Sequence, residues 1–169
     1  IASNDAPTSR VIVIYNDQGT LVEIQRMRTN PNVILVDTGV IAQAPVRFLV
    51  AGIGDALPTK FEAEQSAATR SLNLFGGRPT HSSLVLADTS YRIIRQHGLA
   101  AKQAVERQLV TESVELVVEA NILLSGTGFE SGGLAAAHAL TRGFSATREM
   151  HGCLHGEEVA FGLLVQLVL

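Results

Sequence analysis

The hydrophobic pattern of the chain changes once, near residue 37, from the pattern of strands to the pattern of helices. Residues 11–15 form a β-branched run, which is typical of a strand buried on both faces. After turn residues at 16–19, the pattern predicts a second strand at 20–27 and a third at 33–36. Beyond this point the periodicity is helical. The sequence therefore predicts a mainly α fold with a short N-terminal β segment.

Proline and glycine mark most of the expected helix ends. Pro45 favours a helix start, and residues 46–51 follow it. A longer helix is expected at 80–98, with Gly98 as its stop. Further helices are expected at 99–109, 112–124 and 130–142, the last ended by Gly143, and from His155 onward.

Pro58 interrupts the helical pattern shortly after Asp55. A proline inside a helix costs about 3 kcal/mol, whereas in the first turn its missing N–H would be unpaired anyway. The helix therefore either restarts near Gly54, which places Asp55 about its N-cap, or kinks at Pro58. Both alternatives leave Asp55 at a helix discontinuity, where its carboxylate can point into a cleft.

Asp55 and two histidines are the candidate metal ligands. His138 lies among small residues that allow another helix to approach closely, and His155 stands beside Gly156 at an expected helix start. One carboxylate and two imidazoles suit zinc or another divalent ion, and three protein ligands leave one position for a substrate oxygen. A lone histidine in an apolar helix is more often a core residue, so the residues alone leave both interpretations open.

Residues 126–132 (Gly-Thr-Gly-Phe-Glu-Ser-Gly) look like a dinucleotide-binding glycine loop. That fingerprint requires a preceding strand, whereas residues 112–124 read as a helix. We therefore expect these glycines to form a tight turn between two helices, next to His138.

Charge and composition exclude several classes of partner. The chain has 13 basic and 16 acidic residues, a net charge of −3 and no basic run, which argues against nucleic acid and anionic membranes. Its 169 residues are 46% hydrophobic, enough to bury a core. The single cysteine, Cys153, excludes an internal disulfide and fits a reducing cytoplasm.

Both ends of the sequence suggest a piece of a longer polypeptide. The chain opens on Ile1 rather than methionine, and it closes inside the apolar run 159–169. This run is too short to cross a bilayer, which needs about 20 residues. We therefore expect a helix that continues beyond Leu169.

Segments along the whole chain are similar to glycerol dehydrogenases, in the iron-containing alcohol dehydrogenase superfamily. Those similar to the family's metal-binding segments are GIGDALPTKFEA (52–63), LLSGTGFESGGLAAAHAL (123–140) and HGEEVAFGLLVQL (155–167). Further agreement is found at 1–7, 33–52 and 73–80, in the same order and spacing. The resemblance implies a dehydroquinate synthase-like helical metal-binding domain at 38–169. Residues 1–37 would then be the last strands of an α/β dinucleotide-binding domain.

The resemblance also implies roles for single residues. The family's metal ligands fall on Asp55, His138 and His155, and its contact to a substrate hydroxyl falls on Asp5. Its dinucleotide contacts fall on Ser3, Ser9, Val11 and Tyr15. From the residues alone, these N-terminal positions are better explained as a turn and a core strand.

Thr59 bears on the identity of the metal. Many iron-type relatives have a histidine four residues after this aspartate as a fourth protein ligand, and Thr59 occupies that position here. The difference favours zinc, as in the glycerol branch of the family, without excluding another divalent ion.

The activity implied is metal-dependent oxidation of glycerol, or of a related vicinal diol, to dihydroxyacetone with NAD as the hydride acceptor. A cytoplasmic homo-oligomer is expected. The family's glycine-rich pyrophosphate loop lies upstream of these residues, so we expect this chain on its own to be inactive. Two alternatives stay open: a dehydroquinate synthase-like lyase, disfavoured by the few Lys and Arg residues in the cleft segments, and a non-catalytic helical metal-binding fragment.

Overall fold

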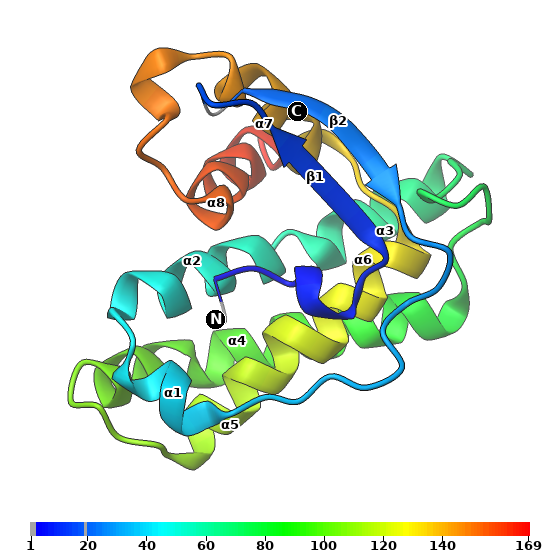
Figure 1. Cartoon of the computed structure of the whole chain (residues 1–169). Helices are drawn as coiled ribbons and strands as arrows, with labels where there is room; N and C mark the ends of the chain where they lie inside the picture. The colour runs from blue at the N-terminus through cyan, green and yellow to red at the C-terminus, as the bar shows by residue number, and fades with distance from the viewer. Residues whose placement is uncertain (1–2, 19) are drawn as a thin grey trace.

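The computed structural model describes residues 3–18 and 20–169, and it consists of a β-hairpin laid against a body of helices (Figure 1). The strands are β1 (Val11–Tyr15) and β2 (Leu21–Arg26), which pair antiparallel. Gly19, in the expected turn, lies outside the described residues, as do residues 1–2 of the similar N-terminal segment. The predicted mainly α fold with an N-terminal β segment is confirmed.

The helices follow the hairpin along the chain. They are α1 (Thr38–Gln43), α2 (Val46–Ala56), α3 (Thr59–Ala68), α4 (His81–Val105), α5 (Glu112–Glu119), α6 (Gly126–Gly132), α7 (Ala136–Ser145) and α8 (His155–Gln166). A π-helical segment, η2 (Ala120–Ser125), joins α5 to α6, and short 3₁₀ turns are found at η1 (Ala6–Thr8) and η3 (Arg148–Met150).

The hairpin is more exposed than the sequence predicts. Val13 pairs with Ile24, and the register shifts between Ile14 and Tyr15. The side chains of Ile12 and Val13 are 41% and 40% exposed, so the prediction of a strand buried on both faces is wrong for this chain. Its sheet has two strands among the described residues, and two strands bury little of their own surface.

Residues 33–36 do not form the predicted third strand. They run as an extended segment outside the sheet, with Val33 81% and Leu35 95% exposed. A β-branched run becomes a strand only where another strand pairs with it, and the described residues offer none at this place.

Helix α4 passes through Gly98, where the sequence predicts a stop, so the separate helix expected at 99–109 is largely its continuation. Thr80 and Ser83 form a capping box at its start. A glycine inside a helix costs about 1 kcal/mol, and the burial of Ala101 and Val105 in the next turns outweighs this cost.

The glycines of residues 126–132 lie inside a helix rather than in a turn. Helix α6 continues directly from the π-helical segment, and the turn before α7 is at Gly133, which has a φ of +93°. A side chain at Gly126 would collide with Thr8, so this glycine allows η1 to pack against the helix. Gly143 does not end α7 either, since that helix runs to Ser145.

Helices α2 and α3 meet at a break around Leu57 and Pro58, which confirms that Asp55 lies at a helix discontinuity. Asp55 is in the last turn of α2, so the alternative in which it caps a restarted helix is wrong. Pro58 caps α3, where its lack of an N–H costs nothing.

Helix α8 begins at His155, as predicted, and packs against α2 and α7 (Figure 1). Glycine makes both contacts possible. A side chain at Gly156 would collide with the carbonyl of Ala51 in α2, and one at Gly162 would collide with the carbonyl of Ala137 in α7. These close approaches place the starts of α7 and α8 beside the end of α2.

Contacts between residues far apart in sequence attach the hairpin, and the residues just before it, to the rest of the chain. Arg10 lies over the ring of Phe75 at 3.8 Å, and the amide N of Leu21 donates to the hydroxyl of Ser145 at 3.4 Å. The hydroxyl of Thr8 donates to a carbonyl of the π-helical segment at 2.7 Å. The hairpin therefore forms one wall beside α6 and α7.

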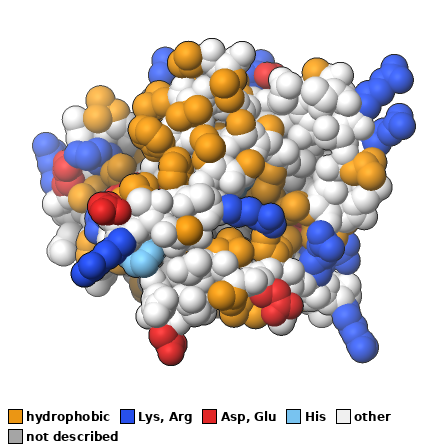
Figure 2. Space-filling model, turned by 90° about the horizontal axis from the view of Figure 1, so that it is seen from above, with side chains coloured by type: hydrophobic (Ala, Val, Ile, Leu, Met, Phe, Trp, Pro, Cys, Tyr) orange, Lys and Arg blue, Asp and Glu red, His pale blue; other side chains and the backbone are white. Residues whose placement is uncertain are grey.

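The surface has many apolar side chains. Figure 2 shows them gathered on the face seen from above in Figure 1, among scattered Lys and Arg residues. The most exposed include Val33, Leu35, Leu99, Val168 and Leu169. Within the described residues, every helix is too short or too polar to cross a membrane.

Candidate metal centre

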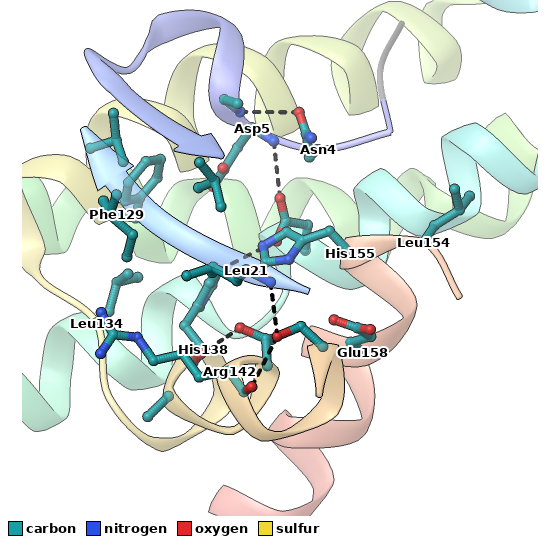
Figure 3. A pocket seen from close by; sticks show the side chains of 18 of the residues that line it. Asn4, Asp5, Leu21, Phe129, Leu134, His138, Arg142, Leu154, His155 and Glu158 are labelled. Atoms are coloured by element: carbon teal, nitrogen blue, oxygen red, sulfur yellow. Dashed lines mark hydrogen bonds and ion pairs between the residues drawn. The ribbon is translucent and has the colours of Figure 1, made fainter. Parts of the chain in front are cut away.

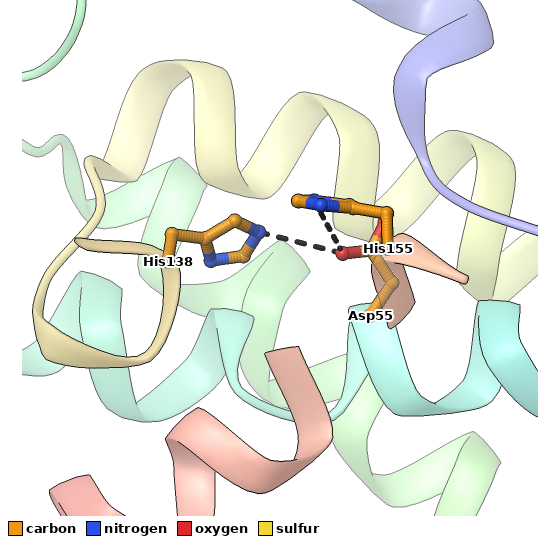
Figure 4. A group of neighbouring side chains, drawn as sticks. All are labelled: Asp55, His138 and His155. Atoms are coloured by element: carbon orange, nitrogen blue, oxygen red, sulfur yellow. Dashed lines mark ion pairs between the residues drawn. The ribbon is translucent and has the colours of Figure 1, made fainter. Parts of the chain in front are cut away.

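Three helices bring Asp55, His138 and His155 together, although up to 100 residues separate them in sequence (Figure 4). Asp55 comes from the last turn of α2, His138 from the first turn of α7 and His155 from the first residue of α8. One ligand atom from each lies within 4.8 Å of the others. The imidazole rings of the two histidines are 5.5 Å apart between centroids.

The distances between these atoms fit a tetrahedral ion. Asp55 Oδ1 is 3.4 Å from His138 Nε2 and 3.4 Å from His155 Nε2. Zinc binds such donors at about 2.1 Å, and the edge of a tetrahedron with bonds of that length is about 3.4 Å. The three atoms are therefore spaced to share one ion.

The carboxylate of Asp55 has one oxygen without a hydrogen bond. Asp55 is fully buried, and its Oδ2 accepts from the backbone N–H of Asp5 at 3.0 Å. Oδ1, which faces the two imidazoles, has no hydrogen-bond partner among the described residues. A buried charged oxygen without a partner is costly, and a cation bound at this point would satisfy it. This observation is the strongest local sign of a metal site.

Glu62, on α3, is a fully buried carboxylate that the sequence analysis missed. Its Oε2 lies 2.5 Å from His138 Nδ1, the ring nitrogen that faces away from Asp55. Metal-binding histidines commonly donate this second ring hydrogen to a carboxylate. In the sequence, Glu62 has no oppositely charged residue three or four positions away, and the helix around it has no distinct apolar face. These features are too common to single out the residue.

The charged groups of the centre shift one another's pKa values. Burial favours the neutral form of Asp55, but the two imidazoles outweigh it and hold the pKa of this carboxyl below its usual value. Burial also disfavours the charged form of His138, yet Glu62 and Asp55 raise its pKa well above the usual range. Burial dominates for His155 and lowers its pKa. The carboxylates of Asp55 and Glu62 thus interact favourably with the imidazole of His138, which lies between them.

Asp5 lies beside the centre without joining the three ligand atoms. Its carboxylate is buried and accepts a hydrogen bond from Ser125 at 2.8 Å, and Ser125 in turn contacts the hydroxyl of Thr59 at 2.7 Å. Burial, followed by the nearby charge of Asp55, raises the pKa of Asp5 well above its usual value. Thr59 thus supports Asp5 through Ser125.

A cavity of about 720 Å³ lies between the hairpin and helices α6, α7 and α8 (Figure 3). Its lining includes Asp5 and all three candidate ligands. Of the residues that the resemblance assigns to the dinucleotide, Ser9, Val11 and Tyr15 line the cavity. Ser3 is half-buried and is not part of the lining. His138 and His155 point into the cavity, with Leu21 of β2 across from them (Figure 3).

Known proteins match the chain along its whole length. It is 49% identical over 169 residues to a glycolaldehyde reductase of Halobacterium salinarum, covering 100% of this chain and 46% of the relative. It is 48% identical, with the same coverage, to a glycerol dehydrogenase of Escherichia coli O6:H1. No protein-family profile matches the chain.

A solved structure agrees with the sequence relatives. The crystal structure of a probable glycerol dehydrogenase from Sinorhizobium meliloti 1021 superposes with a TM-score of 0.95 at 44% identity, covering 98% of this chain and 47% of that one. The chain spans about half the length of the relatives it matches. By sequence and by fold, the chain is similar to the matching half of known glycerol dehydrogenases.

Proposed function

We propose that this chain provides the metal centre and part of the cofactor cleft of an NAD-dependent glycerol dehydrogenase, which oxidises glycerol or a related vicinal diol to dihydroxyacetone. The observation that carries the proposal is Asp55 Oδ1, a buried oxygen without a hydrogen bond, 3.4 Å from two imidazole nitrogens. The relatives at 48% identity, several of them glycerol dehydrogenases, support the choice of reaction.

Asp55, His138 and His155 would hold the ion, and zinc is the metal that we propose. When bound, zinc supplies Lewis acidity that lowers the pKa of a substrate hydroxyl. The donor set supports zinc because it combines two nitrogens with one oxygen and keeps a position open. Thr59 is turned toward Ser125, so it does not provide the fourth ligand found in many iron-type relatives.

Asp5 would bind and orient a second hydroxyl of the substrate. It lines the same cavity as the three ligands, and its contact with Ser125 fixes the carboxylate in place. A vicinal diol carries a second hydroxyl beside the first, and Asp5 would bind it. Apolar side chains such as those of Val11, Val13 and Phe129 form another part of the lining.

Ser3, Ser9, Val11 and Tyr15 would contact the dinucleotide from the hairpin side of the cleft. We further propose that residues 1–37 end the dinucleotide-binding domain and that residues 38–169 belong to the helical metal-binding domain. A cytoplasmic homo-oligomer is also proposed, and exposed apolar residues such as Leu99 support an oligomer. Neither the lyase alternative nor the non-catalytic alternative is better supported, since the relatives at 48% identity are dehydrogenases.

A chimera tests the proposed function. The chain covers 46% of the Escherichia coli O6:H1 relative, and that enzyme can supply the segments that this chain does not match. This chain replaces the matching segment of that enzyme, and NADH formation from glycerol is followed with zinc, after chelation and after zinc is returned. We expect activity that is lost on chelation and restored by zinc.

The same chimera is assayed with NADH for the reduction of glycolaldehyde, because the Halobacterium salinarum relative is named a glycolaldehyde reductase. If the chimera reduces glycolaldehyde faster than it oxidises glycerol at matched concentrations, glycolaldehyde replaces glycerol as the assigned substrate. A folded, zinc-loaded chimera that oxidises no diol would overturn the proposed function.

A further inference from the structure

Glu62 binds two different parts of His138. Its Oε1 accepts from the backbone N–H of His138 at 3.0 Å and from that of Ala135 at 2.8 Å. Its Oε2 contacts the imidazole of the same residue at Nδ1. Glu62 itself is fully buried in α3, so its carboxylate connects α3 to both the backbone and the ring of one candidate ligand.

We propose that Glu62 is a positioning residue that fixes the imidazole of His138 with a proton on Nδ1 and with Nε2 directed at Asp55 and His155. The inference rests on the proposed metal centre. Glu62 acts through His138 and contacts neither metal nor substrate.

The chemistry of the two groups sets the direction of the ring contact. A carboxylate only accepts hydrogen bonds, so Nδ1 must carry the proton that joins it to Glu62. With that proton on Nδ1, the lone pair of a neutral imidazole is on Nε2, which is the nitrogen 3.4 Å from Asp55 Oδ1. Glu62 therefore selects the tautomer that can bind a cation at the centre.

The backbone contacts fix the position of the ring as well. Helix α7 has Ala135 at its N-cap and no side-chain cap of its own. The first turn of a helix leaves N–H groups unpaired, and negative charge is favourable there. Glu62, on another helix, supplies a hydrogen-bond acceptor for these N–H groups and a negative charge. A single carboxylate therefore holds both the backbone and the ring of His138.

If Glu62 only capped helix α7, the contacts of Oε1 would be sufficient, and the contact of Oε2 with the ring would have no effect on metal binding. Glu62→Gln separates the two roles. The amide oxygen of glutamine still accepts from the two backbone N–H groups, but its NH₂ then faces Nδ1. Nδ1 must accept that hydrogen bond, which moves the ring proton to Nε2 and opposes metal binding. The opposite orientation of the glutamine amide is unfavourable, because its NH₂ group would then face the backbone N–H groups of Ala135 and His138, which are also donors.

The test measures zinc affinity by competition with a chelator, together with the thermal unfolding of the metal-free chain. Four proteins are compared: the wild-type 169-residue chain, Glu62→Gln, Glu64→Gln and His138→Ala. Glu64, on the same helix but 51% exposed at its side chain, is the matched control. We expect Glu62→Gln to weaken zinc binding about 10- to 100-fold with little change in the unfolding of the metal-free chain. Glu64→Gln should bind as the wild type does, and His138→Ala should not bind at the centre.

The outcomes separate this inference from the function on which it rests. Wild-type zinc affinity in Glu62→Gln, with binding lost in His138→Ala, overturns the role of Glu62 and leaves the metal centre standing. Wild-type affinity in His138→Ala overturns the centre itself.

If Glu62→Gln does not fold, NMR of the imidazole nitrogens in the zinc-loaded wild-type chain decides the question. A proton on Nδ1 of His138 with zinc at Nε2 supports the inference. Zinc bound at Nδ1 contradicts it.

Discussion

At the scale of single residues, Asp55 uses its two carboxylate oxygens for different tasks. Oδ2 accepts from the backbone of Asp5 and so ties the N-terminal segment to the end of α2. Oδ1 faces the two imidazoles and has no hydrogen bond among the described residues. One carboxylate therefore links the segment that carries Asp5 to the candidate metal centre.

The first prediction concerns Asp5. In the chimera, Asp5→Asn should lower the turnover of glycerol while metal content stays unchanged, because Asp5 lines the cavity but is not among the three spaced ligand atoms. The substitution keeps the shape of the side chain and replaces one carboxyl oxygen with an NH₂ group. NADH formation and elemental analysis are measured on the same samples. Loss of metal in Asp5→Asn would indicate that Asp5 is a metal ligand and would contradict its assignment as a substrate contact.

The positions of Asp55, His138 and His155 were predictable because each has a local signature: a helix break, a small-residue helix and a helix start. Glu62 was not predictable. Its role depends on α3 lying against the start of α7, and that contact joins residues 76 positions apart. Periodicity and spacing report neighbours along one helix, so they carry no information about such a contact.

At the scale of elements, the close contact of α7 with α8 keeps the two histidines in place. Gly162 of α8 lies against the backbone of Ala137, next to His138. This contact leaves no room for a side chain, and so the sequence position of the glycine is fixed by the packing of two helices.

Gly162→Ala should therefore lower the free energy of unfolding by about 1–3 kcal/mol, the usual cost of overpacking. Gly143→Ala is the matched control, since a methyl group at Gly143 of α7 meets open space. Because alanine is the better helix former, this control should raise the free energy of unfolding by up to about 1 kcal/mol. Chemical denaturation of both variants measures the difference. Equal stability of the two variants would show that the α7–α8 contact is looser than described.

An ion-pair cluster between α3 and α4 predicts a pH dependence. Asp88 lies 2.9 Å from Lys60 and 2.7 Å from Arg92, and Lys60 also pairs with Glu64. The hydrogen bond from Lys60, with the charges of both cations, lowers the pKa of Asp88. A lowered pKa in the folded state stabilises the fold above the usual aspartate pKa of about 3.9, and this contribution is lost as the pH falls through the lowered value.

Asp88→Asn should accordingly be slightly less stable than the wild type at neutral pH, and the difference should shrink once the pH falls below about 3.9. The effect is small because the cluster is partly exposed and screened by solvent. Thermal unfolding of both proteins over a range of pH measures it. A difference that grows as the pH falls would contradict the lowered pKa.

Two helix boundaries were easier to predict than the others, whereas the helix expected at 130–142 is divided between α6 and α7. The start of α8 and the break at Pro58 depend on residues at those positions. Gly98 failed as a stop because core contacts in the following turns outweigh the cost of one glycine. The extended segment at 33–36 failed as a strand because pairing requires a partner that local sequence does not specify.

At the scale of the whole molecule, the cavity is a joint product of the hairpin and the helices. Val13 and Tyr15 of β1 line it from one side, and His138 and His155 line it from the other. The candidate ligands from α2, α7 and α8 lie together in its lining, so one bound ion would connect elements from the middle to the end of the chain. Binding to the folded state alone should then raise the unfolding temperature.

The metal content of the chain tests the central claim most directly. The wild-type chain and His138→Ala are loaded with zinc, freed of unbound metal and subjected to elemental analysis and thermal unfolding. The account predicts one tightly bound ion and a higher unfolding temperature with zinc in the wild type, and neither in His138→Ala, because each ligand is needed for the chelate. Undiminished metal in His138→Ala would place the site elsewhere and contradict the account.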